Sequence, residues 1–103
     1  MMSMLHIVNK SPFERNALES CLGHALAGDS VLMIEDCVIG AVMSSKIADS
    51  IKDAMSDKAV YVLEPDLAAR GIAIDRVIEG IKLVDYAGFV DLSVDHDKTQ
   101  SWL

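Results

Sequence analysis

Residues 30–35 (SVLMIE) contain four consecutive apolar residues between two polar ends. A strand that is buried on both faces has this continuous apolar character, which is typical of parallel sheets. Further apolar runs at residues 4–8, 59–63 and 81–84 predict three more strands. Parallel neighbours need a crossover connection, so the segments that separate these runs should contain helices.

The segments between the first three predicted strands carry helix signals. Residues 11–14 (SPFE) offer a capping serine, a proline at the first helical position and a glutamate three residues after the serine. This helix should run to about residue 27, with Gly28 beyond its end. Apolar residues at helical spacing predict a second helix over about 45–56.

The remaining segments complete the predicted fold. Residues 36–45 favour a short helix, and residues 65–71 favour a turn or a short helix. Asp85 can cap a helix over about 86–94, and the tail 98–103 either adds a fifth strand or docks on a partner. Together these elements predict an α/β fold: a small three-layer α/β sandwich with a mainly parallel sheet of four or five strands.

The length and composition fit one domain over residues 1–103. A chain of 103 residues, of which 51% are hydrophobic, can form one core but has no room for a second. The mean hydropathy of +0.31 is high for so small a domain. This excess of apolar residues indicates that partner subunits cover part of the surface.

The charge distribution excludes several classes of function. Nine basic and sixteen acidic residues give a net charge of −7 without a basic stripe, which disfavours direct binding to nucleic acid. No signal peptide and no apolar run of about 18 residues is visible, so we expect no membrane span. Two cysteines without an export signal indicate a cytoplasmic protein with free thiols.

The sequence contains no motif for a resident cofactor or metal. The glycine-rich dinucleotide motif, the phosphate loop, the H-E-x-x-H motif and paired C-x-x-C motifs are all missing, so we expect no cofactor and no metal site. A flavodoxin-like module that binds a nucleotide or flavin is therefore the weakest alternative. Ligands of such sheets gather at the carboxyl ends of the strands, here residues 9–10, 36–37, 64–65 and 85–86.

Cys21 is the main candidate for chemistry, and its position leaves two interpretations open. On the first predicted helix it lies on the same apolar side as Ala17 and Ala25, which is typical of a small buried thiol. An accessible thiolate would instead be a nucleophile, and His24, one turn further along, can assist its deprotonation.

Cys37 also has two interpretations, because it follows the second predicted strand at the edge where ligands gather. A helix that begins there would favour the thiolate, whereas the carboxylates of Glu35 and Asp36 would disfavour it. Cys37 is therefore either a functional thiol or a packing residue.

Other polar and aromatic residues favour structural roles. His6, inside a strand, should be a hydrogen-bonded structural residue, and His96, between two aspartates, should lie in a solvated loop. Asp36 and Asp85 should cap helices rather than act as acids or bases. Trp102 needs cover, either from its own domain or from a neighbouring subunit.

Six short segments, in a fixed order along the chain, carry a family resemblance. They are residues 5–6 with 9–13, then 18–22, 34–36, 65–71, 84–92 and 100–103. Through these segments the chain resembles the DsrH/TusB family of sulfur-relay proteins over essentially its full length. It is most similar to the DsrH branch, because the segment 11–16 (SPFERN) favours that branch and Cys21 matches a cysteine of it. Cys37 departs from the family pattern, in which glycine usually follows the aspartate. The departure argues against a positive φ at this turn, or it marks an added thiol.

The resemblance implies a subunit of a cytoplasmic sulfurtransferase complex that handles protein persulfides. In such complexes this subunit joins DsrE/DsrF-like (TusD/TusC-like) subunits in a heterohexamer, which passes sulfur to a small acceptor protein. The DsrH type serves dissimilatory sulfur oxidation, and the TusB type serves 2-thiolation of the tRNA wobble uridine. The principal sulfur carrier is a cysteine of the DsrE/TusD-type subunit, so two hypotheses stand: Cys21 carries sulfur with His24 as activator, or the chain only supports assembly.

Overall fold

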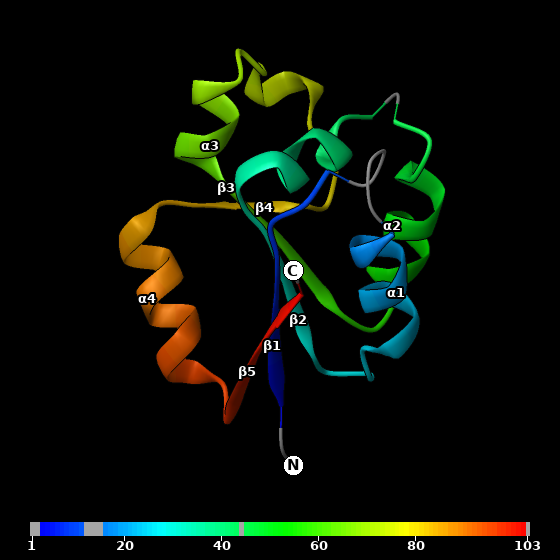
Figure 1. Ribbon diagram of the computed structural model, residues 1–103, viewed down its shortest axis with the longest axis vertical. Coiled ribbons are helices and arrows are strands. Elements are labelled where there is room, and N and C mark those ends of the chain that lie inside the picture. The colour runs from blue at the N-terminus through cyan, green and yellow to red at the C-terminus, as the bar shows by residue number, and fades with distance from the viewer. Residues whose placement is uncertain (1–2, 12–15, 44, 103) are drawn as a thin grey trace.

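The computed structural model describes residues 3–11, 16–43 and 45–102. Its strands form one sheet in the order β4-β3-β2-β1-β5, and every neighbouring pair is parallel. The strands are β1 (Met4–Val8), β2 (Ser30–Met33), β3 (Ala59–Leu63), β4 (Lys82–Val84) and β5 (Lys98–Trp102). The helices are α1 (Ala17–His24), α2 (Ala48–Ala54), α3 (Glu64–Ala69) and α4 (Tyr86–Asp95), with 3-10 helices η1 (Glu35–Ala41) and η2 (Ile74–Arg76). Figure 1 shows α1 and α2 on one face of the sheet and α4 on the other, which confirms the predicted three-layer α/β sandwich.

The strand predictions hold with small shifts. The strands predicted at 4–8 and 59–63 form at those residues. The tail, for which the sequence allows two roles, pairs with β1 from Lys98 to Trp102 and so forms the fifth strand. Strand β2 ends at Met33, two residues earlier than predicted. The reason is that Glu35, just beyond it, takes a left-handed φ of 50°, which is incompatible with an extended strand.

The first helix ends earlier than predicted. Helix α1 stops at His24 because Ala25 is extended, and the chain then turns through Gly28 at a φ of 88°, a conformation that favours glycine. Most of the predicted start, residues 12–15, lies outside the described residues. Within the described ranges, no helix combines the length and apolar character that a membrane span requires.

Only one of the two aspartates that the sequence predicts as helix caps is a cap. Asp85 Oδ1 accepts a hydrogen bond of 2.8 Å from the backbone N–H of Gly88 at the start of α4. Asp36 is not a cap, since it lies within η1 and forms an ion pair with Arg70, at 2.9 Å. The left-handed residue of this turn is Glu35 rather than Cys37, so Cys37 does not stand where glycine is required.

Alternating side chains divide the interior into two cores. The larger core lies beneath α1 and α2 and takes Val8, Val31 and Val60 from the sheet. The smaller core lies beneath α4 and is built on Leu5, Leu32 and Leu92. The face with two helices therefore buries most of the apolar surface, while α4 alone covers the other face (Figure 1).

Candidate functional site

Both cysteines lie inside the larger core. Cys21 on α1 and Cys37 on η1 are each 0% exposed, and both are free thiols. They share this core with Ala17, Leu18 and Val38, all aliphatic. Cys21 therefore lies on the apolar side of its helix, as the sequence predicts. The candidate nucleophile is buried in the folded chain.

Burial also keeps both thiols protonated. Desolvation, with a smaller contribution from the negative charge of Asp29, raises the pKa of Cys21 from its ordinary 9.0 to about 12. Desolvation, with a smaller contribution from Cys21, raises the pKa of Cys37 to about 12. A sulfur carrier needs an accessible thiolate, and neither thiol meets that requirement here.

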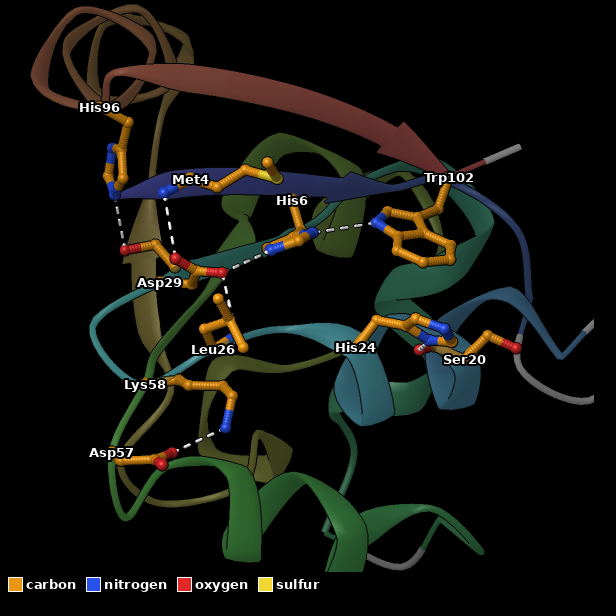
Figure 2. Close-up of polar contacts among 11 residues, drawn as sticks. Met4, His6, Ser20, His24, Leu26, Asp29, Asp57, Lys58, His96 and Trp102 are labelled. Carbon is orange, nitrogen blue, oxygen red and sulfur yellow. Dashed lines mark hydrogen bonds and ion pairs between the residues drawn. The ribbon is translucent and has the colours of Figure 1, made fainter. Parts of the chain in front are cut away.

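His24 turns toward Trp102 rather than toward the thiol. Its Nδ1–H donates to the backbone carbonyl of Ser20 at 2.8 Å, and its ring centroid lies 5.7 Å from that of Trp102 (Figure 2). Among the described residues, no hydrogen bond joins His24 to Cys21. The structure thus does not bring together the two residues that the sequence places one helical turn apart.

A buried polar network links β1, the loop after α1, and β5. Trp102 Nε1–H donates to His6 Nδ1 at 3.0 Å, so this nitrogen carries no proton. The proton of the neutral ring is therefore on Nε2, which donates to Asp29 Oδ2 at 2.9 Å (Figure 2). The network confirms the structural role predicted for His6 and shows that the chain itself covers part of Trp102.

Asp29 is the anchor of this network. It is buried, and it also accepts backbone N–H bonds from Met4 at 3.1 Å and from Leu26 at 3.0 Å. Burial alone would raise the pKa of Asp29, but the hydrogen bonds from His6, Leu26 and Met4 outweigh it and hold the pKa below the ordinary 3.8. Asp29 is therefore ionised at neutral pH and holds three segments together.

His96 corrects a prediction. The sequence predicts a solvated loop histidine, but the ring is half-buried at the end of α4. Its Nδ1–H donates to the carbonyl of Leu92 at 2.7 Å, and its Nε2 accepts from Ser30 Oγ at 2.8 Å. The prediction is wrong because the chain passes almost directly from α4 into β5, which brings this ring over β2.

The carboxyl edge of the sheet holds a polar cluster that joins η1 to α3. Asp66 accepts a hydrogen bond of 2.6 Å from the backbone N–H of Glu35, and Arg70 pairs with Asp36. Within the described ranges, no group of three His, Cys, Asp or Glu residues is arranged to hold a metal ion. The cluster thus fixes the turn after β2.

Comparison with known proteins places the chain in a family. A family model described as "DsrH like protein" matches residues 10–99. The chain belongs to the DsrH-like family. Protein TusB of Buchnera aphidicola subsp. Baizongia pistaciae and Protein TusB of Escherichia coli K12 are each 33% identical to this DsrH-like chain over 99 residues, which is 96% of the chain and 100% of each relative.

Solved structures share the fold of this DsrH-like chain. The ychN protein from Escherichia coli matches with a TM-score of 0.83 at 14% identity, over 98% of this chain and 99% of that one. MTH1491, a protein of unknown function from Methanobacterium thermoautotrophicum, matches with a TM-score of 0.76 at 12% identity over the same shares. At these identities the likeness supports the fold alone.

Sequence reasoning on this DsrH-like chain misses Asp29. The residue precedes β2, and parallel pairing sets Leu5 opposite Ser30, so Asp29 lies beside the start of β1. This register sets Asp29 opposite Met4, which is two positions before His6. Side chains two positions apart on a strand face the same side of a sheet, so Asp29 and His6 share one face. An acidic residue directly before the strand SVLM, which carries the continuous apolar run, is the signal that could have found it.

Proposed function

We propose that the chain is the TusB-type subunit of a cytoplasmic sulfur-relay complex, which it forms with TusC- and TusD-type sister subunits. The support is the match to curated TusB proteins over 96% of the chain and their whole length. The relay would serve tRNA thiolation through a heterohexamer and a small sulfur-acceptor protein, as the family resemblance implies. A net charge of −7 suits delivery to a protein rather than contact with tRNA.

We propose the TusB type rather than the DsrH type, which serves sulfur oxidation. The sequence favours the DsrH branch through the segment 11–16 and Cys21. Among the curated relatives, full-length matches carry the name TusB, whereas the family model is described only as DsrH-like. With Cys21 buried, the residue that favours the DsrH branch has a structural explanation of its own.

The burial of both thiols leads us to propose that the chain assembles the relay without carrying sulfur. In persulfide transfer a thiolate attacks the sulfane sulfur of a donor, a new S–S bond forms as the donor's S–S bond breaks, and the donor leaves as a thiolate. The chain has two cysteines, and both are fully buried and protonated at neutral pH. Cys21 is then a packing residue, and His24 supports Trp102.

Replacing Cys21 by alanine, alone and together with Cys37→Ala, is expected to leave the rate of sulfur transfer by the reconstituted complex unchanged. The reason is that neither sulfur can reach a donor in the folded chain. The complex with its sister subunits would be incubated with a sulfane donor, and mass spectrometry of each subunit would locate the added sulfur. We expect the mass of one sulfur atom on a sister subunit and none on this chain.

The matched control is an alanine substitution at whichever sister-subunit cysteine gains sulfur, which should abolish transfer. Circular dichroism would verify that Cys21→Ala is folded, since removing a buried sulfur costs roughly 1–2 kcal/mol. A persulfide on Cys21, together with slower transfer by the folded Cys21→Ala variant, would overturn the assembly role and restore the carrier hypothesis.

A further inference from the structure

Helix α4 presents an apolar stripe to solvent. Tyr86, Val90 and Val94 are 62%, 61% and 77% exposed, although the same helix buries Leu92 against the sheet. Residues four apart lie on one side of a helix, so the three exposed side chains form a continuous line, which we call the α4 stripe. Figure 1 shows that no other helix lies over the outer side of α4.

The α4 stripe differs from the isolated apolar residues that are found on most protein surfaces. Isolated exposed apolar residues are normal on a soluble protein, whereas a continuous apolar line on one helix is typical of an interaction surface. Ala87, also exposed, lies along the same side of the helix and keeps the surface smooth. An amphipathic helix from a partner can lie along such a line with its own apolar residues.

The border of the stripe is acidic. Asp91 and Asp95 are exposed on α4 next to Val90 and Val94, and Asp85 and Asp97 flank the helix at its two ends. The segment from 85 to 97 contains no lysine or arginine. A partner surface with basic residues beside its apolar residues would therefore match this side of α4 in charge.

We propose that the α4 stripe binds an α-helix of a sister subunit that carries its own apolar line bordered by lysine or arginine. The proposal rests on the proposed function, because it names the surface through which the chain enters the relay complex.

Charge argues against other occupants of the stripe. Two copies of this chain that paired through α4 would bring Asp91 and Asp95 of each copy close to those of the other, and like charges in contact are unfavourable. An anionic membrane surface would be repelled by the same carboxylates. A basic-bordered helix is the occupant that gains from both the apolar line and its rim.

Val90→Asp tests the proposal, because it places a charge in the centre of the stripe. The central residues of an interface carry most of the binding energy, so we expect the affinity for the co-expressed sister subunits to fall about tenfold or more. Binding would be measured by titration with the purified TusC- and TusD-type subunits. Ile74→Asp is the matched control, since Ile74 is 53% exposed on η2 and away from α4, and its affinity should stay within about twofold of wild type.

The acidic rim has a separate test. Asp91→Lys with Asp95→Lys should slow association by about tenfold at low salt and weaken its salt dependence, because the steering charges are reversed. Circular dichroism and thermal unfolding of both stripe and rim variants should match wild type, since all substituted side chains face solvent.

The outcomes separate the two proposals. Normal binding by a folded Val90→Asp variant would overturn the α4 proposal and leave the proposed function standing. A wild-type chain that binds neither sister subunit would overturn both. Sedimentation that shows the wild-type chain as a dimer, and Val90→Asp as a monomer, would mean that a second copy occupies the stripe and would also overturn the α4 proposal.

Discussion

Thiol reagents are expected to label the native chain at least about a thousandfold more slowly than the unfolded chain at pH 8. The pKa of each buried thiol is about 12 instead of 9.0, and this difference lowers the thiolate fraction by about three powers of ten. Full burial slows the reaction further, because the sulfur must first become exposed. The measurement is the rate of reaction with a chromogenic disulfide, in buffer and in urea, with Cys37→Ala and Cys21→Ala used to assign each thiol.

A surface thiol supplies the control for this labelling experiment. Ser50 is exposed on α2, so Ser50→Cys in a background without Cys21 and Cys37 should react at the rate of an unfolded thiol. Fast labelling of Cys21 in the native chain would show that α1 opens readily. Addition of the sister subunits distinguishes a thiol that stays sealed in the complex from one that assembly uncovers.

The fold could be predicted from the sequence because its signals are local and mutually consistent. The mainly apolar runs 4–8 and 59–63 give strand limits that agree with β1 and β3, since a strand covered on both faces is mostly apolar. The end of β2 could not be predicted in this way. It depends on the left-handed backbone of Glu35, whose N–H is held by Asp66 from α3, more than thirty residues later.

The candidate site was less predictable because its contacts are long-range. Helical spacing places Cys21 on an apolar arc, but only the packed structure shows that η1 and the sheet close over that arc. Spacing also places His24 beside Cys21, yet the His24 ring packs on Trp102, which lies 78 positions further along the chain. Partners of this kind are fixed by strand register and not by neighbouring residues.

Replacing Asp29 by alanine is expected to lower the free energy of unfolding by about 3–5 kcal/mol, because removing this acceptor leaves one buried and two part-buried donors unpaired. The lost acceptor serves His6 Nε2–H and the backbone N–H groups of Met4 and Leu26. Urea unfolding at pH 7 would measure the loss, followed by circular dichroism and by the emission of Trp102, the only tryptophan. Asp57→Ala is the control, since Asp57 is an exposed partner of Lys58, and its loss should cost less than about 1 kcal/mol.

The pH dependence gives the Asp29 prediction a definite sign. Since the folded-state pKa of Asp29 lies below its ordinary 3.8, its stabilisation is complete well above that value and is lost as the pH falls through 3.8 toward the folded-state pKa. The difference in stability between wild type and Asp29→Ala should therefore shrink as the pH falls from about 5 to about 2. A difference that stayed constant to pH 2 would mean that the carboxylate charge contributes nothing, and that the loss in Asp29→Ala comes from packing alone. Because Trp102 donates to the His6 ring that Asp29 holds, its emission should change over the same acidic range in wild type and not in Asp29→Ala.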